Sequence, residues 1–320
     1  MSVSQILGAG FTGLDIINLN KKMYLPGGSC TNVMSILANL GFKTILMKAK
    51  YSDIWDSFVD NKLISINVKP YIFKRTIKET PRVVETIENK CHKFYTTCPQ
   101  CNKYLIDLVL PSKKDVASLY TVLSNSSMLY YDRLSPGINL LIEKAYKECV
   151  WTFYEPNAAR SYNTLLSNAL RSNIVKFSTD RISLKVANQL LLDNNTIESN
   201  LKVLIVTKGD RGSLVAYRED DSFSDWISYE SVTNASMIVD TSGAGDWFSA
   251  GFIYKLLKQA PSPKKIINNS IIQAAMEEGV KLSSECCLHI GALSCLFHDN
   301  NSSVLLDNNT PLCSFCYRVR

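Results

Sequence analysis

The sequence predicts an α/β fold with a central, mostly parallel sheet covered by helices on both faces. Segments with the composition of strands alternate with helical segments along most of the chain, and this alternation is typical of parallel sheets. Val203–Thr207 is apolar along nearly its whole length, as expected of a buried strand. A β-rich stretch at about residues 66–112 breaks the alternation, so we expect a smaller sheet there.

Composition restricts the function to a few classes. The 320 residues, of which 46% are hydrophobic, suffice for one domain with a large core, which we place at residues 1–320. The 35 basic and 29 acidic residues give a net charge of +6, spread too evenly to predict nucleic-acid binding. No apolar run reaches membrane-spanning length, and ten cysteines without an export signal predict reduced thiols in the cytoplasm.

The first elements of the chain surround two glycine-rich turns. Residues 6–17 are expected to form a strand that includes a glycine-rich exit and then Asp15. Asp15 is either a turn carboxylate or an acceptor of hydrogen bonds from sugar hydroxyls. A helix is expected after Gly27 and Gly28, because apolar residues recur on one helical face up to a Leu-Gly pair. Asn32 lies in its first turn, where it is either a cap or a ligand of the substrate.

The middle of the chain continues as strands with polar exits. Residues 128–132 are expected to form a strand ending in Asp132, at the edge where open α/β sheets bind substrates. Asp132 is therefore either a substrate ligand or one half of a surface salt bridge. Val203–Thr207 leads into T-x-G-x-x-G, which contains Thr207, Gly209 and Gly212 and by itself is typical of a hairpin turn.

The string D-T-S-G-A-G-D at residues 240–246 carries the most information. Residues 237–239 before it are apolar and are expected to end a strand, whereas the apolar residues after it recur at helical spacing. Gly243 and Gly245 allow a turn whose N–H groups converge on one spot, and the N-terminus of a helix adds positive charge there. We therefore expect a site for a phosphate or an oxyanion. Asp246 is either a partner of the helix dipole or a base for a hydroxyl proton.

Two of these strings together resemble the signatures of the ribokinase-like (PfkB-type) carbohydrate kinases. The first is G-G-x-x-x-N before a helix ending in L-G, and the second is D-T-x-G-A-G-D before an apolar helix. The resemblance extends from residue 6 to about residue 295. It implies a ribokinase-like fold in which the β-rich insert at about 66–112 is a lid over the sugar.

The resemblance also implies roles for individual residues. Asp246 is expected to be the catalytic base, with the amides of Gly243, Ala244 and Gly245 forming an anion hole. The residues expected around the sugar are Asp15, Gly27, Gly28, Asn32 and Asp132. Those expected near the nucleotide are Thr207, Gly209, Gly212 and Gly291, and Asp240 with the loop of Gly291 is expected to line a monovalent-cation site. ATP and Mg²⁺ are the implied cofactors.

The sequence departs from the family pattern in two places. Relatives tend to carry N-x-x-E after the strand at 174–177, with the acid organising Mg²⁺, whereas this chain has Ser178 and Arg181 there. Asp180 is the candidate for a neighbouring stand-in for the acid. An arginine cannot ligate Mg²⁺, although its guanidinium can hold a phosphate. The glycine that precedes the aspartate in relatives is also absent before Asp53.

Four cysteines outside the resemblance form two C-x-x-C pairs. Cys98 and Cys101 lie in the β-rich insert, and Cys313 and Cys316 lie in the tail at 299–320. Two such pairs can complete a tetrahedral Zn²⁺ site, which would be structural because four protein ligands leave no open position. Such an ion would tie the tail to the lid. A redox pair and a chance occurrence remain as alternatives, with His92 as a less favoured substitute ligand.

We therefore expect an ATP-dependent kinase that phosphorylates a hydroxyl of a small, ribose- or fructose-like sugar, with Asp246 as general base. A nucleoside kinase of the same fold and a degraded kinase that acts as a sugar- or nucleotide-binding regulator remain as alternatives. A zinc-organised protein that binds a partner through its cysteine knuckles is a third. The expected partners are the sugar and ATP, without nucleic acid or membrane, and a homodimer is allowed.

Overall fold

The strands in the described part of the chain form a central sheet and a second sheet. The computed structural model describes residues 4–19, 21–88, 91–157, 161–196, 199–220, 222–232, 235–265, 267–297, 304–306, 312, 313 and 316. Within these residues, ten strands form the central sheet and five form the second sheet. No helix in the described part of the chain is long and apolar enough to cross a membrane.

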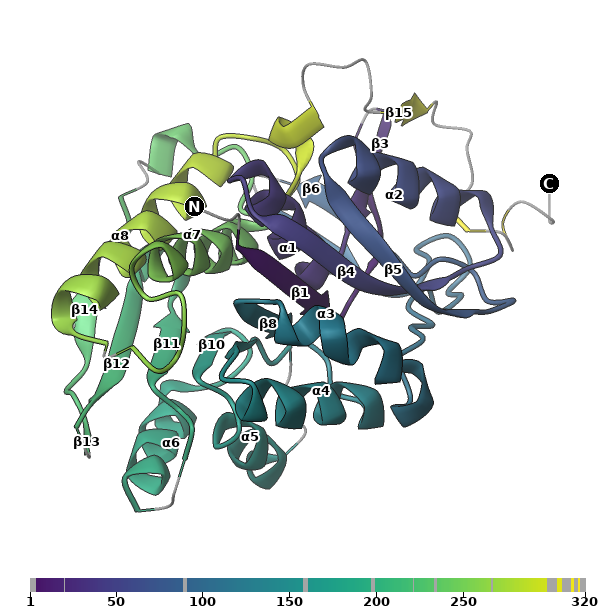
Figure 1. Cartoon of the computed structure of the whole chain (residues 1–320). Coiled ribbons are helices and arrows are strands. Elements are labelled where there is room, and N and C mark those ends of the chain that lie inside the picture. The colour runs from purple at the N-terminus through teal and green to yellow at the C-terminus, as the bar shows by residue number, and fades with distance from the viewer. Residues whose placement is uncertain are drawn as a thin grey trace.

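The central sheet is mostly parallel (Figure 1), which confirms the predicted fold class. Its strands, in order across the sheet, are β13 (Ser222–Phe223), β12 (Ser213–Glu219), β11 (Val203–Thr207), β10 (Ile174–Ser178), β9 (Trp151–Tyr154), β8 (Met128–Tyr131), β1 (Gln5–Ala9), β4 (Lys43–Lys50) and β5 (Val68–Arg75). Neighbours from β11 to β5 run parallel, whereas β12 is antiparallel to β11, and β14 (Ile227–Tyr229) pairs with β12.

The order of the strands reverses at β1. Both β8 and β4 pair with β1 in parallel, and later strands are added outward on each side. Open α/β sheets bind ligands outside the carboxyl ends of the strands at such a point. The topology therefore places a candidate site where β1 and β8 end.

Helices cover both faces of the central sheet, and each face has its own apolar core. Ile6 and Leu7 of β1 belong to opposite cores, because successive side chains of a strand point to opposite faces. The first core contains α1 (Ser29–Asn39), α2 (Ile54–Ser65), α7 (Ala244–Gln259) and α8 (Asn269–Cys286). The second contains α3 (Tyr120–Ser124), α4 (Pro136–Lys147), α5 (Tyr162–Ala169) and α6 (Leu184–Thr196).

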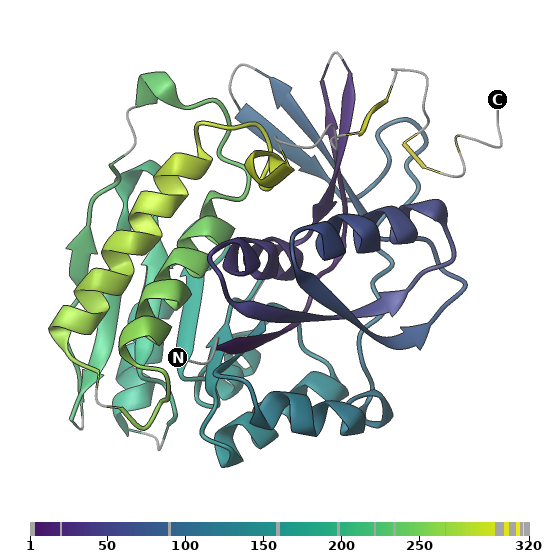
Figure 2. The ribbon, with the colours of Figure 1, turned by 45° about the horizontal axis from the view of Figure 1, so that its top comes forward.

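The second sheet stands apart from the central one (Figure 2). Its order is β15 (Val304–Leu306), β3 (Lys22–Gly27), β2 (Gly13–Asn18), β6 (Arg82–Glu88) and β7 (Cys91–Tyr95). Its limits differ from those of the expected lid. Residues 71–73, which were expected in the lid, belong to β5, where Tyr71 and Ile72 pair with β4, whereas β2 and β3 precede the insert. β-rich composition does not reveal which sheet a strand joins, because pairing depends on distant segments.

Close packing of α7 against α8 fixes the helix that carries the signature aspartate. A Cβ on Gly251 would lie 2.7 Å from the carbonyl oxygen of Glu278, so glycine at this position lets the two helices approach closely. The segment before the signature differs from the prediction. A short 3₁₀ helix (Ala235–Met237) replaces the expected strand end, and Met237 and Val239 are exposed. An apolar run this short cannot distinguish a strand from an exposed turn.

Candidate active site

The turn at 240–246 forms the N-terminus of α7, as expected. Gly243 has a φ of 78°, and a Cβ there would lie 2.3 Å from the Cβ of Ala292, so the position requires glycine. The N–H of Ala244 donates to the carbonyl of Thr241 at 3.2 Å. Within the described residues, the N–H groups of Gly243 and Gly245 have no acceptor. Of the three amides expected in the anion hole, two are therefore available to a ligand.

The two signatures of the sequence meet at Asn32 and Asp246. Nδ2 of Asn32 donates to Oδ2 of Asp246 at 2.7 Å, across 214 positions of sequence. Oδ1 of Asn32 is buried and lacks a donor in the described part of the chain. The cap interpretation does not apply, because the N-cap of α1 is Gly28 and it has no side-chain bond. A buried acceptor without a donor is rare, so this oxygen is well placed for a ligand hydroxyl.

The carboxyl group of Asp246 has an unusual proton affinity. Burial, with a smaller contribution from the carboxylate of Glu155, raises the pKa of Asp246 to about 7. The hydrogen bond from Asn32 and the charges of Lys176 and Arg181 act in the opposite direction. A base with a pKa near the working pH is ionised often enough to act and still basic enough to take a proton.

The buried ammonium group of Lys176 donates to the backbone of this turn. Lys176 on β10 is 1% exposed, and its Nζ donates to Oε1 of Glu155 at 2.6 Å, to the carbonyl of Gly245 at 2.7 Å and to Oγ of Ser249 at 2.9 Å. Oε2 of Glu155 accepts from Ser249 at 2.7 Å and from the hydroxyl of Tyr130 at 3.1 Å. This network fixes the carbonyl of Gly245 and with it the orientation of the turn.

Sequence reasoning missed this network. A signal was present, because Lys176 interrupts an apolar strand, and a lysine in a buried strand needs partners for its charge. Its main partner could not be identified from the sequence, because Glu155 follows the neighbouring strand 21 positions earlier.

Asp15 on β2 lies against the glycine pair of the first signature. A Cβ on Gly27 would lie 2.1 Å from Cγ of Asp15, and a Cβ on Gly28, where φ is 96°, would lie 2.5 Å from the carbonyl oxygen of Phe11. Both glycines are therefore required by contacts within the protein. Burial and then the charges of Glu85 and Asp246 raise the pKa of Asp15 well above its usual value. The charge of Asp246 thus acts on Asp15, as expected if the two carboxyl groups share one site.

Asp132 lies at the reversal point of the sheet and faces the exit of β1. Its Oδ1 accepts from the N–H of Phe11 at 2.8 Å, and a Cβ on Gly10 would lie 1.7 Å from that oxygen. Its Oδ2 lies 3.3 Å from Nη1 of Arg133. Asp132 is 3% exposed, and these contacts fix the turn after β1. Binding of the sugar by Asp132 stays a prediction.

The second sheet contacts the signature turn directly. Oε2 of Glu85 on β6 accepts from Oγ of Ser242 at 3.1 Å, and burial raises the pKa of Glu85 to about 7. Nδ1 of His92 on β7 lies 3.0 Å from Oγ1 of Thr241 and 3.5 Å from Oδ1 of Asp240. His92, considered as a substitute zinc ligand, therefore lies beside the turn instead.

Asp240 joins the turn to the loop after α8. Its Oδ1 accepts from the N–H of Ser242 at 3.0 Å, and its Oδ2 accepts from the N–H of Gly291 at 2.7 Å. Burial opposes ionisation of Asp240, but hydrogen bonds from His92, Gly291 and Ser242 outweigh it and lower the pKa. The expected neighbourhood of Asp240 and Gly291 is confirmed as a contact. Their role at a monovalent cation stays a prediction.

Thr207 ends β11, and the turn that leads to β12 contains Gly209 and Gly212. It is a hairpin closed by the N–H of Lys208, which donates to the carbonyl of Gly212 at 2.8 Å. The N–H of Thr179, just after β10, donates to the carbonyl of Thr207 at 2.9 Å. The hairpin therefore lies beside the carboxyl end of β10. Contact with a nucleotide stays a prediction.

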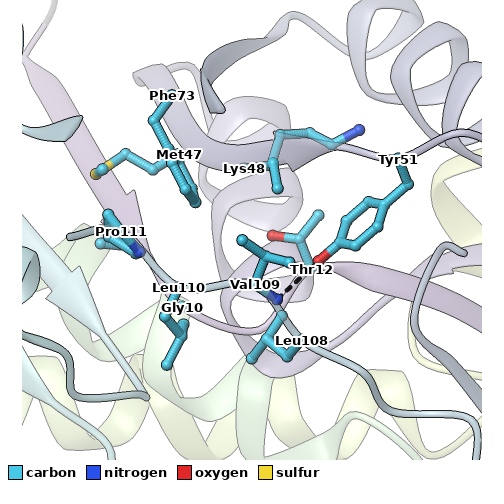
Figure 3. A pocket seen from close by; sticks show the side chains of 12 residues that line it. Gly10, Thr12, Met47, Lys48, Tyr51, Phe73, Leu108, Val109, Leu110 and Pro111 are labelled. Atoms are coloured by element: carbon cyan, nitrogen blue, oxygen red, sulfur yellow. Dashed lines mark hydrogen bonds between the residues drawn. The ribbon is translucent and has the colours of Figure 1, made fainter. Parts of the chain in front are cut away.

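A small cavity lies at the same edge of the central sheet (Figure 3). It is lined by residues at the ends of β1, β4 and β5 and by the segment 108–111, whose Val109 N–H donates to the hydroxyl of Tyr51 at 3.2 Å. Its volume of about 10 Å³ holds at most one water molecule. This cavity is a gap in the packing and cannot hold a sugar.

Comparison with protein families gives a match over most of the chain. The model described as "pfkB family carbohydrate kinase" matches residues 16–298. No curated protein matches the sequence.

Solved structures match over nearly the whole chain at low sequence identity. Ribokinase from Giardia lamblia is 14% identical with a TM-score of 0.72, covering 91% of this chain and 96% of that one. Adenosine kinase from Schistosoma mansoni in complex with 2-fluoroadenosine is 15% identical with a TM-score of 0.74, covering 91% and 98%. A fructokinase double mutant from Vibrio cholerae O395, with fructose, ADP and potassium ion bound, is 18% identical with a TM-score of 0.68, covering 92% and 96%. These likenesses show a shared fold.

Proposed function

Because the chain belongs to the pfkB family of carbohydrate kinases, we propose that it transfers the γ-phosphoryl group of ATP to a hydroxyl of a small sugar. The structural neighbours include a ribokinase and a fructokinase, the latter with fructose and ADP bound. A ribose- or fructose-like acceptor is preferred, because the groups beside Gly27 and Asn32 are small and polar and suit hydroxyls. Asp246 is the proposed general base.

The observation that carries the proposal is the set of unsatisfied groups around Asp246. Oδ1 of Asn32 lacks a donor in the described part of the chain, and the N–H groups of Gly243 and Gly245 lack acceptors there. Near a carboxylate, a free acceptor oxygen suits a sugar hydroxyl, and two free N–H donors suit a phosphoryl group. A helix cap alone would not require this combination.

In the proposed reaction, the sugar hydroxyl gives its proton to Asp246 as its oxygen forms a bond to the γ-phosphorus. The bond from that phosphorus to the bridging oxygen breaks, and ADP leaves. Asn32 orients the carboxylate through its bond to Oδ2. The N–H groups of Gly243 and Gly245 donate to oxygens of the transferring group, where negative charge develops.

The family implies Mg²⁺, but the protein residues at the expected position do not form a site for it. Arg181 stands where relatives carry the acid, and the neighbouring Asp180 shares a hydrogen bond of 3.2 Å with Oγ of Ser178. A guanidinium repels the ion, whereas its planar fork matches phosphate oxygens. We therefore assign no step to a protein-bound metal and propose that Arg181 contacts a phosphate.

The direct test is transfer of labelled γ-phosphate from ATP to a panel of sugars and nucleosides. We expect the labelled phosphate to be transferred to ribose or fructose. Label on nucleosides alone would identify a nucleoside kinase. If no acceptor is labelled while a sugar or an ATP analogue raises the midpoint of thermal unfolding, the protein is a binding regulator.

Asp15→Asn tests the proposed sugar contact. Loss of a charge-assisted hydrogen bond, worth about 1.5–3 kcal/mol, should raise KM for the sugar about 10–100-fold, with a smaller change in kcat. The free energy of unfolding should not fall, because burial and the charges of Glu85 and Asp246 already oppose ionisation of Asp15 and raise its pKa. Steady-state kinetics and urea denaturation measure the two effects.

Asp107→Asn is the control, because that side chain is 59% exposed in a surface pair with Lys78. An unchanged KM in Asp15→Asn would remove Asp15 from the sugar site.

A further inference from the structure

Four cysteine thiols from distant parts of the chain meet beside the second sheet. Cys98 and Cys101 lie in the loop after β7, and Cys313 and Cys316 lie in the C-terminal tail, 212 to 218 positions later. The Sγ–Sγ distance is 3.8 Å for Cys98 and Cys316, 3.4 Å for Cys101 and Cys313, and 3.6 Å for Cys313 and Cys316. All four sulfur atoms lie within 4.8 Å of one another.

These distances match a tetrahedral site more closely than a pair of disulfides. Four Zn–S bonds of about 2.3 Å place the sulfur atoms roughly 3.8 Å apart, whereas a disulfide requires about 2.05 Å. All four cysteines are free, Cys98 is 0% exposed and Cys313 is 2% exposed. Because the thiols converge on one centre, a single ion can contact all of them.

The first pair lies on a loop whose shape is set by its own backbone. The bridge between Thr97 and Tyr104 closes a hairpin, within which the N–H of Cys98 donates to the carbonyl of Lys103 at 2.7 Å. Asn102 has a φ of 61°, and its N–H donates to the carbonyl of Cys98 at 2.8 Å. Asparagine tolerates this left-handed conformation better than most residues. These hydrogen bonds fix the backbone of the loop that carries both thiols.

The tail that carries the second pair contacts the second sheet at two further points. Its strand β15 pairs with β3 (Figure 1). The carbonyl of Leu312, next to Cys313, accepts from Nη1 of Arg82 at 3.4 Å. Arg82 is buried, and its Nη2 lies 2.5 Å from Oδ2 of Asp53. The second cysteine pair is thus held against the first by contacts that do not involve sulfur.

We propose that Cys98, Cys101, Cys313 and Cys316 bind one structural Zn²⁺ ion that fastens the tail to the second sheet. Four thiolates satisfy the tetrahedral preference of Zn²⁺ and leave no position for a substrate. Sets of soft thiolate ligands select zinc or iron over magnesium and calcium. The ion fastens β15 and the loop of Cys98 together across the sheet whose strand β2 carries Asp15. The proposal is independent of the proposed kinase activity.

The test is the metal content of the full-length protein, purified with a reductant and without a metal-affinity step. Elemental analysis should find about one zinc per chain after dialysis. Titration of the thiols with an organomercurial should release this zinc into a colorimetric indicator. Replacement by Co²⁺ should give the visible absorption of a tetrahedral thiolate complex, and a strong chelator should lower the midpoint of thermal unfolding.

Matched variants locate the ion. Cys101→Ser and Cys316→Ser, which alter the two half-buried ligands, should lose the zinc, whereas Cys149→Ser should retain it, because Cys149 lies outside the cluster. If a ligand variant fails to fold, the cobalt spectrum and zinc release of the native chain still decide. Absence of metal, stoichiometric iron in place of zinc, or intact-mass evidence of disulfides among the four cysteines would overturn the proposal. None of these results depends on phosphoryl transfer, so failure of the zinc proposal can be distinguished from failure of the proposed function.

Discussion

Asp246→Asn is expected to lower kcat by a factor of about 10²–10⁴, because the variant lacks the base that takes the hydroxyl proton. The asparagine has nearly the same shape, and its oxygen can still accept from Nδ2 of Asn32, which lies 2.7 Å from the carboxylate. Affinity for ATP should therefore be unchanged. Steady-state kinetics and a nucleotide-binding titration measure the two quantities.

The matched control for this variant is Asp225→Asn, a substitution of the same kind at an exposed position. It should leave kcat unchanged. If Asp246→Asn is as active as the parent protein while it binds ATP normally, Asp246 is not the base.

The pH dependence of the parent enzyme should report the ionisation of Asp246. Its pKa is raised to about 7, so kcat/KM should rise with pH and reach half of its plateau near that value. The folded-state pKa lies above the unfolded value, so the stability due to the protonated carboxyl is full below the unfolded pKa and is lost as pH rises through about 7. Asp246→Asn should therefore be at least as stable as the parent above this pH. A pH profile without this acidic limb would contradict the assignment.

Lys176→Met is expected to reduce the free energy of unfolding by about 3–5 kcal/mol, because it leaves the carboxylate of Glu155 buried without its cation. The carbonyl of Gly245 also loses a donor at 2.7 Å. Removal of the nearby positive charge should raise the pKa of Asp246 further and move the acidic limb of kcat/KM to higher pH. Urea denaturation and the pH profile measure these effects.

Two control variants distinguish loss of the buried ion pair from a general effect of removing a lysine charge. The double variant Lys176→Met/Glu155→Gln should recover much of the lost stability, because no unpaired charge remains. Its acidic limb should lie at lower pH than that of Lys176→Met, since the carboxylate of Glu155 raises the pKa of Asp246. Lys144→Met removes the surface ion pair between Lys144 on α4 and Glu148. It should lower the free energy of unfolding by only about 0.5 kcal/mol or less. A single variant at Lys176 no less stable than Lys144→Met would refute the supporting role of the network.

The sequence alone was sufficient for the fold class and for the two signatures. Alternation of apolar strands with helical segments predicts the parallel sheet, because this pattern depends on local periodicity. Gly243 and Gly28 were identifiable for a similar reason, because positive φ angles of 78° and 96° select glycine whatever surrounds them. The positions of Asp246 and Asn32 relative to these glycines followed directly.

Only the tertiary structure decided which distant groups meet. Asn32 donates to Asp246, and Lys176 pairs with Glu155. Asp132 accepts a hydrogen bond from the turn after β1, and the two cysteine pairs form one cluster. The tertiary structure also moves residues 71–73 into the central sheet. Such contacts depend on strand order and on packing between elements far apart in sequence, for which neither composition nor spacing carries a signal.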